Sequence, residues 1–163
     1  MAVLLLTGPP GVGKTTLLRR VAGGLGASGF LTEEIRRKGR RVGFRIVPFD
    51  GPGRVMAHVD FDGPRVGRYG VDVAAIDEVA EHALRPGRDL YLVDEIGRME
   101  CFSETFVRRM RALLDAERVV ATIALRGAGF IAAAKRHPDA ALWEVTPDNR
   151  DGLVEEVLLW ISP

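Results

Sequence analysis

The sequence predicts an α/β fold in which helices cover both faces of a mainly parallel sheet, and three observations support this prediction. Apolar runs with the length of buried strands alternate with segments of helical periodicity. The first of these runs, residues 2–6, leads directly into a glycine-rich loop. One stretch, roughly residues 29–60, instead has the alternating pattern of an antiparallel hairpin. We therefore expect a single domain over residues 1–163 that carries a hairpin insertion or a decorated sheet edge.

Composition sets the class of protein. A chain of 163 residues with 47% apolar content is long enough for one compact core and too short for two ordinary domains. The 23 Lys and Arg residues nearly balance the 22 Asp and Glu residues, which does not indicate a dedicated nucleic-acid binder. The single cysteine, Cys101, cannot form an internal disulfide, and no apolar stretch is long enough to span a bilayer. We expect a cytoplasmic protein without a membrane partner.

The glycine-rich loop has the spacing G-x-x-x-x-G-K-[ST] of a phosphate-binding loop, the Walker A motif. Glycines lack the Cβ atom that would keep the main chain away from a polyphosphate. We expect Lys14 to reach the β- and γ-phosphates, as a catalytic cation, and the Thr15 hydroxyl to bind Mg²⁺. A helix is predicted over 15–22, so that its free N–H groups also face the phosphates. The predicted nucleotide-binding residues are Gly8, Pro9, Pro10, Gly11, Val12, Gly13, Lys14, Thr15 and Thr16.

The next elements form the predicted hairpin region. Residues 29–37 and 41–49 mix β-branched and aromatic residues with charges around a Lys38-Gly39 turn, which predicts two antiparallel strands. A third short run, residues 54–59, follows another Gly/Pro turn and is expected to extend them. Five basic residues gather within residues 36–41, either as a solvated hairpin tip or as a contact for phosphates.

Strands and helices alternate through the rest of the chain. Helical spacing predicts a helix over 73–84 with Asp72 as its N-cap, and another over 104–114 with Ser103 at its start. The remaining elements expected are strands over 90–93, 119–125 and 141–145, and helices over 130–135 and 153–161. In such a fold the ligand lies at the carboxyl ends of the parallel strands.

Two acids end the predicted strand over 90–93, which is the pattern of a Walker B segment. We expect Asp94 to hold Mg²⁺ together with Thr15. Glu95 is the candidate base that orients and deprotonates a water attacking the γ-phosphorus. Such a pair of acids is common at a solvated strand end, but its combination with the phosphate loop indicates a hydrolase.

Further cations would offset the negative charge that develops on the transferring phosphoryl group. Arg98 and Arg126 both follow predicted strands at the expected ligand edge, and an arginine so placed can raise a rate by about 10³–10⁵-fold. The alternative for both is a surface position or pairing with Glu95 or Glu100. Thr122, inside its strand, is expected only to pack.

Base recognition is poorly marked in the sequence. Asn149 and Arg150 follow the last predicted strand, where Asn149 would contact a base edge and Arg150 would either stack or pair with a phosphate. A helix-capping turn before Leu153 explains the same residues equally well.

Several motifs together resemble the THEP-type nucleoside-triphosphatase family, in the family's order and over nearly the whole chain. These motifs are residues 29–36 (GFLTEEIR), 42–44 (VGF), 69–72 (YGVD), 93–100 (VDEIGRME) and 149–151 (NRD). The resemblance implies a RecA-like P-loop NTPase fold and Mg²⁺-dependent hydrolysis of ATP, GTP, CTP and UTP to the diphosphate and phosphate, with broad base tolerance. It also implies a second group of nucleotide-binding residues: Leu90, Tyr91, Leu92, Val93, Asp94, Glu95, Ile96 and Gly97. Family members often have lysine where this chain has Arg98, and the two side chains differ in fork geometry and hydration.

Two other functions remain as alternatives. In a small nucleotide or polynucleotide kinase, Glu95 would act on an acceptor hydroxyl and the basic hairpin would clamp the second substrate. Kinases of this size usually have an arginine-rich lid, and residues 125–129 are too few for one. In a nucleotide-dependent switch or adaptor, hydrolysis would be slow and would depend on a partner.

Overall fold

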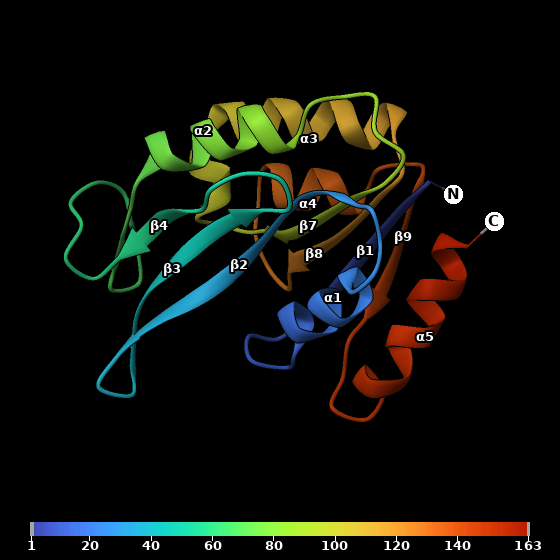
Figure 1. Ribbon diagram of the computed structural model, residues 1–163, viewed down its shortest axis with the longest axis horizontal. Coiled ribbons are helices and arrows are strands. Elements are labelled where there is room, and N and C mark those ends of the chain that lie inside the picture. Colours follow the sequence, from blue (N-terminus) through green and yellow to red (C-terminus); the bar gives the residue numbers. More distant parts are fainter. Residues whose placement is uncertain (1, 163) are drawn as a thin grey trace.

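The computed structural model describes residues 2–162, in which a single mixed sheet has helices on both faces (Figure 1). The strands are β1 (Val3–Gly8), β2 (Ser28–Arg37), β3 (Arg40–Pro48), β4 (Arg54–His58), β5 (Arg65–Val66), β6 (Tyr69–Val71), β7 (Tyr91–Ile96), β8 (Val119–Ala124) and β9 (Ala140–Glu144). The helices are α1 (Lys14–Ala22), α2 (Val73–Ala83), α3 (Glu104–Ala116), α4 (Phe130–Lys135) and α5 (Arg150–Ile161), and a 3₁₀ turn spans Glu100–Phe102. The predicted α/β class is confirmed.

The parallel half of the sheet has the strand order β2-β7-β8-β1-β9. Every residue of β1 is buried, because strands pair with it on both sides and helices cover both faces. The predicted parallel arrangement of the Walker A and Walker B strands is therefore correct. β8 lies between them, so that the carboxyl ends of β1 and β7 face the same edge of the sheet.

The antiparallel half continues the same sheet in the order β5-β6-β4-β3-β2. Lys38 and Gly39 form its two-residue turn with φ angles of 53° and 76°, and a hairpin loop of this length favours such positive values. Strand β2 belongs to both halves, because its first three residues pair in parallel with β7 and the remainder pairs with β3. The hairpin thus extends the sheet edge. Strands β5 and β6 are too short for a periodic pattern to predict them.

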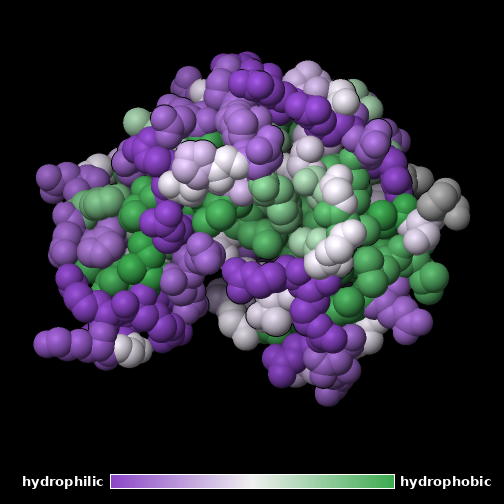
Figure 2. Space-filling view, in the orientation of Figure 1, coloured by the Kyte–Doolittle hydropathy of each residue, from purple (hydrophilic) through white to green (hydrophobic). Residues whose placement is uncertain are grey.

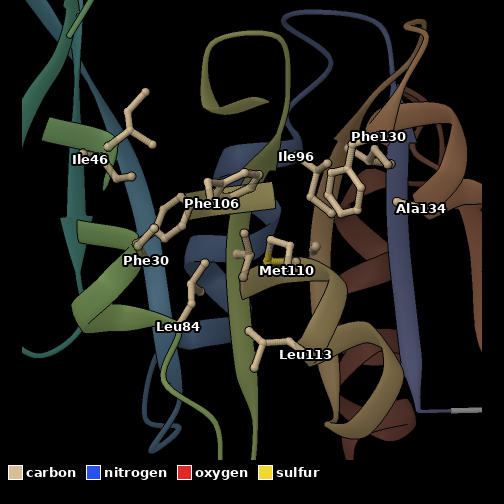
Figure 3. Packing of buried hydrophobic residues seen from close by; sticks show 14 of the residues in the cluster. Phe30, Ile46, Leu84, Ile96, Phe106, Met110, Leu113, Phe130 and Ala134 are labelled. Atoms are coloured by element: carbon tan, nitrogen blue, oxygen red, sulfur yellow. The ribbon is translucent and has the colours of Figure 1, made fainter. Parts of the chain in front are cut away.

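The helices divide between the two faces (Figure 1). Helices α1 and α5 pack on one face, and α2, α3 and α4 supply apolar side chains to the cluster on the other. Figure 3 shows this second cluster, in which Phe30 of β2 and Phe106 of α3 lie with ring centroids 6.1 Å apart. Ile96, at the end of the Walker B strand, points into the same layer as Phe130 of α4. The core therefore supports the strand ends that carry the predicted site.

Two predicted helix caps are confirmed. The Asp72 carboxylate accepts a hydrogen bond from the Ala75 N–H at 3.1 Å, and the Ser103 hydroxyl accepts one from the Phe106 N–H at 3.0 Å. Among the described residues, none of the helices is both long enough and apolar enough to cross a membrane.

The hairpin tip and the loop between β1 and α1 reach the same edge of the molecule, the lower edge in Figure 1. Residues 36–41 are all exposed, and the projecting tip is hydrophilic in Figure 2. The surface is indented between the hairpin and the side that carries α1 and α5 (Figure 2). The predicted phosphate site therefore lies at an open edge beside the hairpin.

Candidate active site

The phosphate loop joins the buried strand β1 to helix α1 in a compact turn. The Val12 N–H donates to the Pro9 carbonyl at 3.2 Å within it. Gly13 ends the loop with φ of 111°, a conformation that residues with a Cβ rarely adopt, and its carbonyl accepts the first helical hydrogen bond from the Leu17 N–H. The glycine spacing found in the sequence thus corresponds to a backbone that needs glycine.

Lys14 lies almost completely inside this loop, with only 9% of its surface exposed. Its ammonium group donates to the Gly8 carbonyl at 2.8 Å and to the Ile123 carbonyl at 3.4 Å. Its Nζ atom is also 3.2 Å from Glu95 Oε2. The predicted loop cation and the predicted base are therefore in direct contact.

Asp94 is the most enclosed acid of the site, with 1% of its surface exposed. Its Oδ1 atom accepts hydrogen bonds from the Thr15 hydroxyl at 3.2 Å and from the Thr122 hydroxyl at 2.7 Å. Its Oδ2 atom accepts one from the Thr32 hydroxyl at 2.8 Å, with the Thr32 N–H at 3.4 Å. Thr15 and Asp94, the two residues predicted to bind a metal together, are therefore in contact. Thr122 and Thr32 also donate to the Asp94 carboxylate.

Two of these threonines correct or extend the sequence analysis. Thr122 was expected only to pack, and this is wrong, because its hydroxyl donates to a buried carboxylate. Thr32 was not singled out, although it stands in one of the motifs of the family resemblance. The register of the neighbouring strands explains the position of Thr122. Ala121 pairs with Val93, so the next residue of each strand, Thr122 and Asp94, lies at about the same level.

Glu95 differs from Asp94 in its surroundings, since 32% of its side-chain surface is exposed. Burial raises the pKa of its carboxyl group, the positive charge of Lys14 lowers it, and the negative charge of Asp94 raises it again. The net effect is a raised pKa, which strengthens the carboxylate as a base. The group therefore combines access to solvent with the basicity that a proton acceptor requires.

A third acid, Glu100, lies behind Glu95 and is 3% exposed. A Cβ atom at Gly97 would lie 2.9 Å from Oε1 of Glu95 and 2.9 Å from Oε1 of Glu100, so the two carboxyl groups flank this glycine. Burial, with the charges of Glu95 and Asp94, raises the pKa of Glu100 well above its usual range. Glu100 is therefore not the exposed ion-pair partner of an arginine that the sequence suggested.

Arg98 and Arg126 are both exposed, in the segments that follow β7 and β8. Within residues 2–162 neither forms an ion pair with an acid, so the expected alternative of pairing with Glu95 or Glu100 is not found. Both guanidinium groups lie on the surface.

The segment before α5 is a turn that uses the side chain of Asn149. The Asn149 side chain accepts from the Thr146 N–H at 2.8 Å and donates to the Glu144 carbonyl at 2.9 Å. Arg150 donates to the Val12 carbonyl at 3.2 Å, next to Gly13. The turn interpretation therefore explains Asn149, while Arg150 braces the phosphate loop.

The residues at the loop suit a small divalent cation. Thr15 and Asp94 offer only oxygen atoms, the ligands that Mg²⁺ prefers, and phosphate oxygens and water usually complete its shell. Among the described residues there is no group of three or more His, Cys, Asp or Glu side chains that would hold a metal without such help. The donor set thus fits Mg²⁺ bound together with a phosphate ligand.

Two pockets of the surface lie away from the phosphate loop. One of about 490 Å³ is lined by residues between Asp60 and Val73, and one of about 210 Å³ lies between His82 and the start of β2. No residue of the phosphate loop lines either pocket. The candidate site is distinguished by the contacts among Lys14, Glu95, Asp94 and Thr15.

Comparisons with known proteins find similar sequences and structures over nearly the whole chain. The family model described as NTPase matches residues 3–158. Nucleoside-triphosphatase THEP1 of Thermotoga petrophila is 41% identical over 95% of this chain and 90% of its own length, and the human cancer-related nucleoside-triphosphatase is 33% identical over 98% and 96%. The crystal structure of THEP1 from Aquifex aeolicus covers 99% of both chains with a TM-score of 0.86 and 36% identity. The solution structure of the human protein has a TM-score of 0.83 and 32% identity, over 99% of this chain and 98% of its own.

Proposed function

Because the chain belongs to the NTPase family, we propose that it hydrolyses nucleoside 5′-triphosphates to the nucleoside diphosphate and phosphate, with Mg²⁺ as cofactor. The observation that carries this proposal is the contact of Lys14 with Glu95, one residue from the Asp94–Thr15 hydrogen bond. A phosphate-binding cation, a candidate metal ligand pair and a candidate base thereby lie within one group of side chains. This is the set of groups that phosphoryl transfer to water requires.

Lys14 and the loop amides would bind the substrate. On binding, the ammonium group would exchange its contact with Glu95 for the β- and γ-phosphate oxygens, which leaves Glu95 free to accept a proton. When bound, Mg²⁺ would neutralise charge on the same oxygens, held by Thr15 and Asp94. The N-terminus of α1 adds its free N–H groups.

Glu95 would act on the attacking water. Its carboxylate would orient the water and accept its proton while the water oxygen bonds to the γ-phosphorus and the bond to the β-phosphate oxygen breaks. The nucleoside diphosphate leaves, and Glu95 returns its proton to solvent. The partial exposure of Glu95 supports this role, because water must reach the carboxylate.

Arg98 and Arg126 are the candidates for charge stabilisation during transfer. Both end on the surface at the edge where the γ-phosphate would lie, and exposed arginines can move onto a ligand without breaking an internal ion pair. Substituting each with alanine, and measuring turnover at saturating nucleotide, would separate their contributions.

We propose broad base tolerance, with ATP, GTP, CTP and UTP all as substrates. Asn149, the one amide that the sequence suggested for reading a base edge, already uses both of its polar atoms in a turn. A site that contacts mainly the triphosphate cannot strongly discriminate between bases.

The test is steady-state phosphate release from each of the four nucleotides with Mg²⁺ and no other substrate. We expect release from all four, with kcat/KM values within about tenfold of one another. Release that requires an added acceptor hydroxyl would favour the kinase instead. Release that starts only after addition of cell extract or nucleic acid would favour the partner-dependent switch.

A further inference from the structure

We propose that Thr32 is a positioning residue that orients Asp94 for the metal, an inference that rests on the proposed function. Thr32 lies in the strand that begins the hairpin, outside both the phosphate loop and the Walker B strand. Its hydroxyl donates to Asp94 Oδ2 at 2.8 Å. The antiparallel half of the sheet would thereby contribute directly to the site.

The first step concerns the needs of a buried carboxylate. Asp94 is 1% exposed, and within residues 2–162 no lysine or arginine forms an ion pair with it. A carboxylate removed from water must then be stabilised by hydrogen bonds. Hydroxyl donors from three threonines supply them, from α1, β8 and β2.

The second step concerns how the donors divide between the two oxygens. Oδ1 has two hydroxyl donors, Thr15 and Thr122, whereas Oδ2 has one, Thr32, with only the longer 3.4 Å contact of the Thr32 N–H besides. Removal of the Thr32 hydroxyl would leave Oδ2 poorly satisfied, and the orientation of the carboxylate would then be held mainly through Oδ1. Rotation of the carboxylate would displace Oδ1, the oxygen that accepts the hydrogen bond from Thr15.

The third step explains why Thr32 itself is held firmly. Parallel backbone pairing between β2 and β7 ends at Phe30 with Val93, so the side-chain bond from Thr32 links the two strands beyond the last backbone pair. On its other side, Arg19 of α1 donates to the Thr32 carbonyl at 2.9 Å. Thr32 is thus linked through its carbonyl to the helix that follows the phosphate loop and through its hydroxyl to the Walker B strand. A residue fixed on both sides can orient a metal ligand.

The test compares Thr32→Val, which removes the hydroxyl at nearly constant volume, with Thr32→Ser, which keeps it. Mn²⁺ binding in the presence of ADP, followed by electron paramagnetic resonance, gives a readout independent of turnover. We expect Thr32→Val to weaken Mn²⁺ binding by about tenfold and Thr32→Ser to restore it to within about threefold of the wild type. Affinity for ADP without metal should remain unchanged. Thr32→Ala removes the same hydroxyl and serves as the second variant.

The matched control is Thr7→Val in β1. The Thr7 hydroxyl is also buried near the loop, but it donates to the Ala124 carbonyl at 3.4 Å and not to Asp94. Mn²⁺ binding by a folded Thr32→Val protein equal to that of the wild type, or an equal loss in Thr7→Val, would overturn the role of Thr32 alone. Failure of the wild-type protein to bind Mn²⁺ with ADP would overturn the proposed function as well.

Discussion

Ion pairs of similar length occupy two different environments in this molecule. At the phosphate loop, Lys14 and Glu95 lie 3.2 Å apart, with 10% and 32% of their side-chain surfaces exposed. In the hairpin, Glu34 lies 2.7 Å from Arg36 and 3.2 Å from Arg41, with all three side chains more than 40% exposed. The N···O distances alone would predict equally strong ion pairs at the phosphate loop and in the hairpin.

The pKa values of Glu95 and Glu34 shift in opposite directions. Burial dominates at Glu95 and raises its pKa, although Lys14 lowers it. Burial also acts on Glu34, but the hydrogen bonds and charges of Arg36 and Arg41 together outweigh it and lower its pKa. Desolvation thus tunes the chemistry of a buried pair, whereas an exposed pair contributes little beyond solubility. The comparison predicts large effects at the loop and small ones at the hairpin.

The largest effect is expected from Glu95→Gln, which keeps the shape of the side chain and removes the proton acceptor. We expect kcat to fall by about 10²–10⁴-fold, because general-base catalysis contributes about that much. Affinity for the Mg²⁺-nucleotide should change little. Phosphate release and fluorescent-nucleotide binding measure the two quantities. Near-normal turnover would mean that another group activates the water.

Lys14→Ala should affect binding and turnover together. Loss of the ammonium group removes charge stabilisation of the phosphates and also leaves Glu95 without its cation. We expect a fall in kcat of about 10²-fold with weaker nucleotide binding. Isothermal titration and phosphate release, compared with Glu95→Gln, would distinguish a binding residue from a base. A variant with unchanged affinity would contradict the assignment of the loop.

Glu100→Gln tests the cost of a buried acid. Its folded-state pKa is raised, so the fold keeps the proton on Glu100 to a higher pH than the unfolded chain does, and stability is lost as pH rises from the unfolded pKa towards the folded one. We expect the variant to be more stable than the wild type at pH 8 by on the order of 1 kcal/mol, and nearly equal at pH 4. Urea unfolding at the two pH values measures this. A variant that is less stable at pH 8 would show that the acid is stabilised in its charged form.

Glu34→Gln should give the smallest effect. An exposed ion pair contributes about 0.2–1 kcal/mol, and salt screens it. We expect a small loss of stability that disappears at high salt, with unchanged phosphate release. A loss of turnover in this variant would indicate that the hairpin takes part in catalysis. The exposed ion pairs of Glu34 would then matter for activity as the Lys14–Glu95 pair does.

The features that could be predicted from the sequence are those that depend on residues close together in the chain. The glycine spacing, the apolar strands and the strand-end acids are patterns within short segments, and these segments are arranged as the α/β fold requires. Caps such as Asp72 and Ser103 follow from the same kind of local chemistry. Such patterns also predict Lys14 and Asp94 as residues of the site.

Only the tertiary structure decided which polar side chains meet at Asp94 and which acid is enclosed. Thr32 and Thr122 lie 62 and 28 positions away from Asp94 along the chain, and each looks like an ordinary strand threonine in the sequence. Glu100 lies two positions after Arg98 in the sequence, yet it is buried close to the Glu95 carboxylate. A hydrogen bond or a desolvated charge depends on packing between distant segments, and no local pattern encodes that packing. The sequence by itself determined which chemical groups are available, and the fold determined which of them lie in contact.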